Sequence, residues 1–434
     1  MSAGTDRGFE RDRDEFARGA RAIVVLPDRG DASRDADARL AETAGLAAAI
    51  GVVVVDRVVL KVREPRAAML IGSGQAEQIA TLVRMEEAGL VVFDAALSPI
   101  QQRNLETALG AKVIDRTGLI LEIFGERAAS AEGRLQVELA HLDYQAGRLV
   151  RSWTHLERQR GGFGFLGGPG ETQIEADRRL IRDRMARLRR ELDQVIRTRS
   201  LHRDRRQRAP WPIIALVGYT NAGKSTLFNR LTGADVMTED LLFATLDPTL
   251  RQISLAGIEK AILSDTVGFV SDLPTQLVAA FKATLEEVVS ADLLIHIRDV
   301  AHPDSEAQRA DVETVLAEIG VADITPRFEV WNKLDLLDAD RHAELIVEAA
   351  RRTDVVAISA LDGEGVNILI DTVAAKLTAQ HRRYRFVLDA GDGAGAAWLH
   401  AHGEVLGTAV EGDEALYDVR LSAADHDRFN RRDA

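Results

Sequence analysis

Several residue types and patterns are missing from this chain of 434 residues. Cysteine is absent, which excludes disulfides and thiolate metal sites and is typical of a reducing compartment. The longest apolar run covers residues 44–55, whereas a membrane-spanning helix needs about 20 apolar residues. The first 20 residues mix acids with arginines and lack the apolar segment of a signal peptide. We therefore expect a cytoplasmic protein without integral membrane insertion, with a peripheral location at the membrane as the alternative.

Lysine is also scarce, and charge is unevenly distributed along the chain. There are seven lysines against 48 arginines, and the net charge of −13 argues on average against nucleic-acid binding. Residues 171–208 nevertheless hold 13 arginines and seven acids. Such a basic stripe is either a solvated helix face or the electrostatic footprint of a nucleic acid. The ten histidines show no spacing typical of metal ligands.

A strand-like segment at 213–217 leads into a glycine loop and then into a helical pattern. The loop fits G-x-x-x-x-G-K-S, in which glycines let backbone N–H groups surround phosphate oxygens at a helix N-terminus. Lys224 would reach the β- and γ-phosphates, and the Ser225 hydroxyl would bind Mg²⁺. The predicted phosphate-binding residues are Gly218, Tyr219, Thr220, Asn221, Ala222, Gly223, Lys224 and Ser225.

Two further segments would surround the terminal phosphate and the metal. Asp265 ends a strand and is placed to hold the Mg²⁺ water shell, while the Gly268 N–H could contact the γ-phosphate. Thr245 lies between the two motifs and can close over Mg²⁺ when the γ-phosphate is present. Lys224, Thr245 and Gly268 are the catalytic candidates, and Ser225 and Thr245 the metal ligands. The predicted nucleotide contacts in these segments are Phe243, Ala244, Thr245, Leu246, Asp247, Asp265, Thr266, Val267 and Gly268.

A later strand ends in the pattern N-K-L-D, which predicts the base. An aspartate carboxylate can accept hydrogen bonds from guanine N1 and N2, and adenine lacks this donor pair and would leave the carboxylate unpaired. The backbone of the tripeptide S-A-L, further on, should touch guanine O6. The predicted ligand is GTP or GDP, and the activity is that of a GTPase. The base-site residues are Asn332, Lys333, Leu334, Asp335, Ser359, Ala360 and Leu361.

The residue after D-x-x-G is Phe269, where Ras-like GTPases have a water-orienting glutamine. Phenylalanine cannot orient water, so intrinsic hydrolysis should be slow and should need an activator. Asn221 suggests one route, because an asparagine at this place in some translation-related GTPases helps to bind K⁺ near the phosphates. K⁺ is therefore a candidate cofactor beside GTP and Mg²⁺.

The stretch GGFGFLGGPG at 161–170 satisfies the dinucleotide pattern G-x-G-x-x-G, which requires a preceding strand. Apolar residues at alternating steps of four and three run from Leu135 to Leu156, and a similar seam runs from Ile174 to Val195. Both seams predict helices that pack as an antiparallel hairpin, with a capping-box start at Thr172. Without a preceding strand, the dinucleotide interpretation fails.

The hairpin tip leaves two interpretations open. It is either a flexible turn or a segment built for a partner. A turn between antiparallel helices needs only about 2–8 residues and no phenylalanine. The length and the phenylalanines of this tip therefore favour a segment that binds a partner. A second loop, GSGQ at 72–75, precedes a helix without a lysine, so a second nucleotide site is not expected there.

These patterns predict an α/β protein built around a P-loop GTPase domain with a mostly parallel sheet. It should carry an N-terminal α/β domain, a long antiparallel helical hairpin and a small C-terminal α+β domain. The expected boundaries are a flexible tail over 1–20, the N-terminal domain over 21–129, the hairpin over 130–208 with its tip at 161–170, the GTPase domain over 209–379 and the C-terminal domain over 380–434.

Over about residues 20–434 the chain resembles the HflX family of GTPases. The residues that carry the resemblance are VVFDAALSPIQQRNLE (91–106), GPGETQIEADRR (168–179), FATLDPTLRQI (243–253) and DTVGFVSDLPTQLVAAFKATLEE (265–287). The glycine-rich tip is about one residue longer than the usual glycine run of the family.

The resemblance implies a protein that binds the large ribosomal subunit. Its N-terminal region would lie against ribosomal RNA, with the tip near the peptidyl transferase centre, and its GTP form would split stalled or idle ribosomes. It implies no DNA partner, and we expect a monomer. The alternatives are a GTP-binding switch for a protein partner such as a membrane protease, and a tRNA-modifying GTPase, which would need a cysteine or cofactor site.

Overall fold

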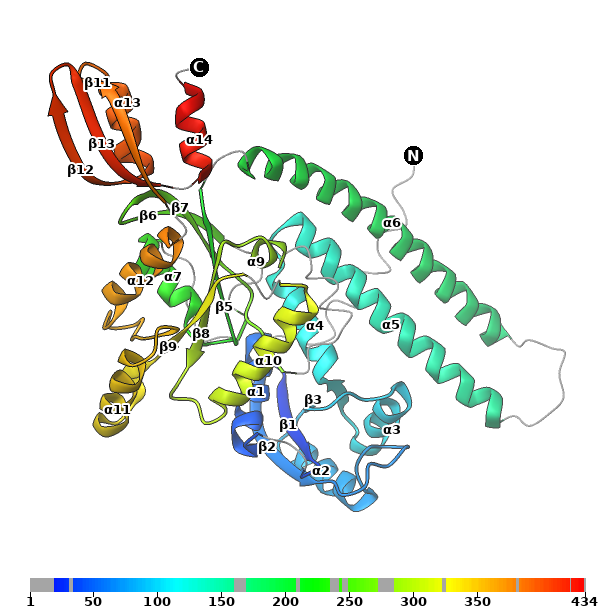
Figure 1. The fold of residues 1–434 in the computed structure, drawn as a ribbon. Coiled ribbons are helices and arrows are strands. Elements are labelled where there is room, and N and C mark those ends of the chain that lie inside the picture. Colours follow the sequence, from blue (N-terminus) through cyan, green and yellow to red (C-terminus); the bar gives the residue numbers. More distant parts are fainter. Residues whose placement is uncertain are drawn as a thin grey trace. The chain divides into compact units, whose positions relative to one another are not determined.

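The computed structural model describes residues 19–30, 34–159, 169–207, 211–234, 242–243, 249–271, 285–321, 325–379, 382–421 and 423–432. The chain forms two compact units (Figure 1). The first combines Met1–Ile196 with Glu239–Leu246 and Asp272–Phe281, and the second holds the remainder. Residues 161–168 of the predicted tip lie outside the described residues, as does most of the predicted N-terminal tail. Among the described residues, no helix combines the length and apolar composition that membrane crossing requires.

The first unit begins with a four-stranded parallel sheet in the order β2-β1-β3-β4. β1 and β3 are almost fully buried, as their continuous apolar runs predict for a parallel sheet. The strands are β1 (Arg21–Asp28), β2 (Val53–Lys61), β3 (Leu90–Phe93) and β4 (Lys112–Asp115). The helices are α1 (Ala36–Ala49), α2 (Ser73–Met85), α3 (Pro99–Leu109) and α4 (Arg116–Arg127).

Two long helices follow, α5 (Ala131–Gln159) and α6 (Pro169–Gln207), and they form the predicted hairpin (Figure 1). The heptad prediction is confirmed, because Leu142, Ile181, Met185 and Leu188 form a buried cluster with partly buried Leu135, Leu139 and Ala146. The predicted start at Thr172 is wrong. The helix begins three residues earlier at Pro169, since proline is well suited to the first helical turn.

The carboxylate of Asp115, at the end of β4, attaches α5 to the N-terminal sheet. It is 2 % exposed and accepts hydrogen bonds from the Leu97 and Gly118 N–H groups at 3.0 and 2.8 Å. From α5 it accepts the Tyr144 hydroxyl at 2.6 Å and the Arg148 guanidinium at 2.9 Å. Burial, and next the Asp115 charge, raise the pKa of Tyr144 well above its usual range. Tyr144 therefore stays a neutral hydrogen-bond donor.

The second unit contains a six-stranded sheet in the order β10-β9-β8-β5-β7-β6. All pairs are parallel except β6 with β7, which confirms the predicted mostly parallel sheet. The strands are β5 (Ile213–Gly218), β6 (Thr249–Leu255), β7 (Ile258–Asp265), β8 (Leu293–Asp299), β9 (Arg327–Asn332) and β10 (Val355–Ala357). The helices are α7 (Lys224–Thr232), α9 (Glu286–Val289), α10 (Ser305–Glu318), α11 (Ala339–Ala350) and α12 (Val366–Thr378), with a short 3₁₀ turn at Leu334–Leu336.

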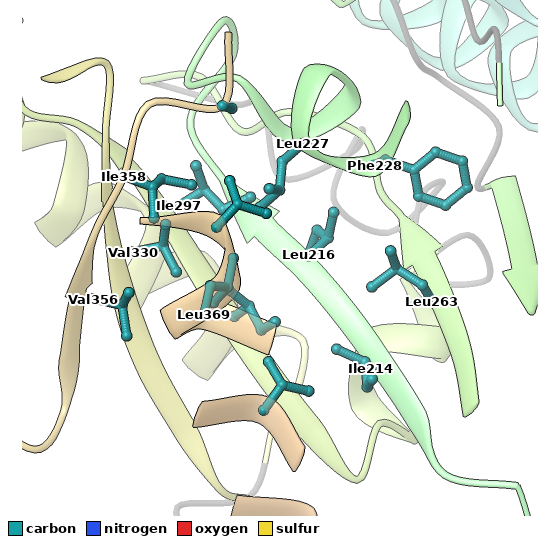
Figure 2. Close-up of a cluster of buried hydrophobic side chains, with 14 of the residues drawn as sticks. Ile214, Leu216, Leu227, Phe228, Leu263, Ile297, Val330, Val356, Ile358 and Leu369 are labelled. Carbon is teal, nitrogen blue, oxygen red and sulfur yellow. The ribbon is translucent and has the colours of Figure 1, made fainter. Parts of the chain in front are cut away.

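Hydrophobic side chains cover both faces of this sheet. On one face, residues of β5, β8 and β9 pack with Leu227 and Phe228 of α7 and Leu369 of α12 (Figure 2). On the other face, Trp331 packs with Leu345 of α11. The loops after the buried parallel strands are thereby held at one edge of the sheet, where ligands bind in such folds.

A small antiparallel sheet in the order β11-β13-β12 ends the chain, as the predicted α+β appendage requires. Its core contains Phe386, Leu399 and Phe429. The elements are β11 (Arg382–Asp389), α13 (Gly393–His402), β12 (Glu404–Glu411), β13 (Glu414–Leu421) and α14 (Ala423–Arg432). The last helix was not predicted, because its charged sequence carries little apolar signal.

Replacing Asp115 by alanine should destabilise the first unit by about 3–5 kcal/mol, because Arg148 would be left half-buried without its carboxylate. The measurement is denaturant unfolding combined with hydrogen exchange in α5. Arg187→Ala is the matched control, since it removes an exposed ion pair with Glu191 and should cost less than about 1 kcal/mol. Equal losses in both variants would contradict an anchoring role for Asp115.

Candidate nucleotide-binding site

The glycine loop between β5 and α7 is shaped by two glycines with positive φ. Gly218 has φ 153°, and a Cβ there would collide with the Ile297 carbonyl. Gly223 has φ 94°, and a Cβ there would collide with the Asn332 amide. Neither position tolerates a side chain, because the backbone of β8 and the Asn332 side chain at the end of β9 approach the loop directly. The loop is thus tightly fixed at the edge of the sheet.

Lys224 is buried at the start of α7. Its Nζ donates to the carbonyls of Gly218 and Tyr219 at 3.1 and 2.7 Å. Burial lowers the pKa of Lys224 to about 8, and the Asp265 charge opposes this shift. At neutral pH the ammonium is therefore largely protonated and is held inside the loop, as phosphate binding requires.

The side chains of Ser225 and Asp265 meet beside the loop. The Ser225 hydroxyl donates to Asp265 Oδ2 at 2.7 Å, and Asp265 is fully buried at the end of β7. A hydroxyl and a carboxylate are oxygen ligands of the kind that Mg²⁺ prefers, one direct and one through water. The structure therefore brings the predicted metal ligand Ser225 together with the carboxylate that was predicted to hold the water shell of Mg²⁺, and these two groups fit the ion.

The segment after Asp265 lies directly on the glycine loop. The Phe269 N–H donates to the Gly218 carbonyl at 3.1 Å, and the Thr220 N–H donates to the Phe269 carbonyl at 2.7 Å. The Thr266 hydroxyl donates to the Leu216 carbonyl at 2.6 Å. Phe269 is 1 % exposed, so its ring is part of the core. Gly268 is thereby held beside the loop, and the buried ring at 269 has no group that could orient water.

Asn332 connects the phosphate loop with the predicted base site. Its Nδ2 donates to the Ala222 carbonyl at 2.8 Å, and its Oδ1 accepts the Ala360 N–H at 2.9 Å. The Ser359 hydroxyl donates to Asp335 Oδ1 at 2.6 Å and so orients the exposed carboxylate. The structure therefore brings both predicted base-binding segments together, and the Asp335 carboxylate lies exposed beside them.

Two supporting residues were missed by the sequence reasoning. Arg230 of α7 donates to the Ala360 carbonyl at 2.7 Å and also to the Leu361 carbonyl, and so holds the loop that follows β10. Asp299, at the end of β8, pairs with Lys333 at 2.8 Å. The position of Asp299 at a strand end was a usable signal, whereas nothing in the sequence indicated Arg230.

The remaining predicted residues are placed as follows. Phe243 belongs to the first unit, where it is 2 % exposed and its ring meets that of Phe124 at 4.7 Å and 74°. Asn221 has φ 58° and is exposed in the phosphate loop. Four predicted contacts lie outside the described residues: Ala244, Thr245, Leu246 and Asp247.

Nucleotide affinity should depend on pH through Lys224. It should fall as the pH rises above about 8, because the neutral amine cannot pair with phosphate. The effect on folding has the opposite sign. Burial holds the folded pKa below the unfolded value of 10.5, so the contribution of Lys224 to stability rises with pH from about 8 to 10.5. Fluorescent GDP titration measures the affinity, and circular dichroism over the same range checks folding. Constant affinity up to pH 9.5 would contradict the assignment.

Models of protein families match four consecutive parts of the chain. Residues 37–125 match "GTP-binding GTPase N-terminal" and residues 127–206 match "GTP-binding GTPase Middle Region". Residues 213–333 match "50S ribosome-binding GTPase" and residues 344–433 match "HflX C-terminal domain".

Complete proteins are also similar to the chain. The GTPase HflX of Magnetococcus marinus is 48 % identical over 405 residues, which cover 93 % of each chain. The GTPase HflX of Escherichia coli K12 is 47 % identical over 79 % of this chain and 80 % of its own. The GDP complex of a GTP-binding protein from Sulfolobus solfataricus is 25 % identical, covers 83 % of this chain and 99 % of its own and has a TM-score of 0.45, which is too low to bear on function. With all four parts matched in order, the chain belongs to the HflX family of GTPases.

Proposed function

We propose that this GTPase binds the large ribosomal subunit and its RNA and uses GTP to split stalled or idle ribosomes. Membership of a family whose GTPase model is described as 50S ribosome-binding supports the partner. The observation that carries the proposal is the basic surface of α6. Helices α5 and α6 together form an arm, which is joined to the N-terminal sheet through the bond between Arg148 and Asp115. We further propose the domain boundaries given above, cytoplasmic location and a monomeric state.

In this proposal the backbone of the loop at 218–225 surrounds the phosphates, and Lys224 supplies positive charge to the β- and γ-phosphates. Ser225 and Thr245 would hold Mg²⁺ and Asp265 would hold its water shell, and the ion would neutralise developing charge on the phosphates when bound. Gly268 offers its N–H to the terminal phosphate. Asp335 accepts from guanine, and Ser359 keeps that carboxylate oriented. Phe243, Ala244, Leu246 and Asp247 would contribute backbone contacts.

The chemistry of this site is incomplete in the isolated protein. Phe269 is buried and bonded through its backbone to the phosphate loop, so no side chain at this position orients the attacking water. We propose that basal turnover is slow and that the large ribosomal subunit raises it. Asn221 would help to hold K⁺ near the phosphates, where the ion would contribute further positive charge.

The arginines of α6 divide into two classes. Arg184 is paired with Glu138 at 2.7 Å, and Arg187 is paired with Glu191 at 2.9 Å. Arg182 and Arg189 are exposed, and within the described part of the chain neither has a carboxylate at ion-pair distance. Arginines whose charge is not neutralised are the ones that gain most from phosphate contacts. They support RNA as the partner of the arm.

A regulatory switch for a protein partner, such as a membrane protease, is the alternative function. It uses the same nucleotide site but has no need of arginines held free of carboxylates. A protein partner would also bind with little of the steep salt dependence that phosphate contacts cause. Salt dependence therefore distinguishes the two proposals.

Asp335→Asn tests the base site. The change should weaken GTP binding by about 1–3 kcal/mol and favour xanthosine nucleotides, because the amide donates where the carboxylate accepted. Isothermal titration with GTP and xanthosine triphosphate measures both effects. Asp338→Asn, at the N-cap of α11, is a matched control outside the site. Unchanged GTP affinity in Asp335→Asn would exclude guanine recognition by this carboxylate.

Double alanine variants of the arm test the partner. Arg182→Ala with Arg189→Ala should lower the slope of log affinity for large subunits against log salt by roughly 1.5 units, as expected for two lost phosphate contacts. Arg184→Ala with Arg187→Ala has the same net charge but removes paired arginines, and should change the slope much less. The measurement is subunit binding from 50 to 300 mM KCl. Equal slopes for the two variants would contradict the proposal that the exposed arginines contact RNA phosphates.

A further inference from the structure

Arg230 lies in the last turn of α7 and makes its hydrogen bonds outside that helix. An arginine in a last turn commonly stabilises its own helix, through the final carbonyls or the helix dipole. Arg230 instead donates from Nε to the Ala360 carbonyl at 2.7 Å and from Nη2 to the Leu361 carbonyl. Within the described part of the chain, no carboxylate lies at ion-pair distance from it. Its guanidinium is therefore committed to the loop that follows β10.

The backbone of this loop fits the guanidinium closely. Gly363 has φ 95°, a left-handed conformation that favours glycine. A Cβ at this position would lie 2.6 Å from Nη1 and 3.3 Å from Cζ of Arg230. The Gly363 N–H donates to the Ser359 carbonyl at 2.8 Å and closes the loop. A planar guanidinium offers donors in a fixed fork, which the point charge of a lysine does not. Arginine at 230 and glycine at 363 thus belong to one contact.

The bonds from Arg230 fix the orientation of peptide units in the loop. In a trans peptide the C=O group and the following N–H group point in opposite directions. The Leu361 carbonyl is bonded to Arg230, so the Asp362 N–H of the same peptide unit is turned away from the guanidinium. That N–H donates to the Ser359 hydroxyl oxygen at 3.0 Å. Arg230 and Ser359 therefore hold opposite sides of one rigid peptide plane.

The Ser359 hydroxyl connects this peptide unit with the base site. A hydroxyl has one hydrogen and two lone pairs. Because its oxygen accepts the Asp362 N–H, its hydrogen is directed elsewhere, and it donates to Asp335 Oδ1 at 2.6 Å. A continuous series of bonds therefore joins Arg230 to the Asp335 carboxylate. The proposed function assigns this carboxylate to guanine, and the present inference rests on that assignment.

Other contacts hold this part of the loop only weakly. Asn332 accepts the Ala360 N–H at 2.9 Å and so fixes the start of the loop. The Leu361–Asp362 peptide unit lies beyond that bond, and Leu361 is 66 % exposed, so burial does little to hold it. Among the described residues, Arg230 is the group that binds the carbonyl side of this unit. The orientation of the unit should therefore depend on Arg230.

We propose that Arg230 is a positioning residue for recognition of the guanine base. It fixes the Leu361–Asp362 peptide unit and thereby, through Ser359, the orientation of the Asp335 carboxylate toward the N1 and N2 donors of guanine. A carboxylate that is already oriented loses less freedom when the nucleotide binds. The inference predicts an effect of Arg230 on the choice of base and none on the choice between GDP and GTP.

The test compares GDP with inosine diphosphate, whose base lacks the N2 amino group, by isothermal titration. Arg230→Ala should weaken GDP binding by about tenfold and inosine diphosphate binding by less than about threefold, because the N2 contact depends on an oriented carboxylate. Arg230→Lys keeps the charge without the fork and should behave like Arg230→Ala. Arg341→Ala is the matched control, since it removes only an exposed ion pair with Glu344. Thermal unfolding of each variant checks that it folds.

A double variant tests whether Arg230 acts through Asp335. In an Asp335→Asn background, Arg230→Ala should cost less than about threefold further GDP affinity, because the contact that it orients is already lost. Four results would overturn the proposal: unchanged GDP affinity in Arg230→Ala, equal losses for GDP and inosine diphosphate, an Arg230→Lys variant that binds like the original protein, and a full tenfold loss in the Asp335→Asn background.

Failure of the proposed function would be recognised separately. The unmodified protein would then show no preference for GDP over inosine diphosphate, or Asp335→Asn alone would leave GTP affinity unchanged. A normal preference in the unmodified protein, together with a normal loss in Asp335→Asn and no effect of Arg230→Ala, would contradict only the role of Arg230.

Discussion

The nucleotide site depends on the side-chain amide of Asn332. It donates to Ala222 in the phosphate loop and accepts from Ala360 in the loop after β10, so one side chain sets the spacing between the phosphate and base ends. Gly223 lies so close to this amide that no side chain fits between them. Any larger residue at 223, or any change at 332, should therefore disturb both ends together. The hydrophobic core beneath, shared by β5, β8, β9 and α12, keeps the participating strand ends in place.

The sequence was sufficient to predict the order of the site segments, because the motifs follow strands whose carboxyl ends meet at one sheet edge. This reasoning predicted Gly218, Lys224, Ser225, Asp265, Asn332 and Asp335, and the structure shows how they contact one another and the neighbouring loops. The reasoning could not find Arg230, whose role arises only from three-dimensional contact with the Ala360 carbonyl. Nor could it show that Ser359 orients Asp335 or that Phe243 packs on Phe124, since neither contact leaves a local pattern.

Charge pairing explains how an acidic protein can carry a basic surface. The net charge of −13 describes the whole chain, whereas ligand binding is decided by charges that lack a local partner. On α6, Arg184 and Arg187 are largely neutralised by Glu138 and Glu191, whereas Arg182 and Arg189 have no carboxylate at ion-pair distance among the described residues. The seam of Leu142, Ile181, Met185 and Leu188 fixes which side of α6 faces away from α5. The sequence indicated a basic helix, but only the fold separates the two classes.

The central claim is that a guanine-nucleotide switch governs an encounter with the ribosome. Sedimentation of intact ribosomes with the full-length protein through a sucrose gradient tests it most directly, with parallel samples containing GDP or a non-hydrolysable GTP analogue. The account predicts that the analogue makes the protein co-migrate with the large subunit and increases the free-subunit peaks, whereas GDP does neither. Protein that stays at the top of the gradient with both nucleotides, or ribosomes that remain intact with the analogue, would contradict it.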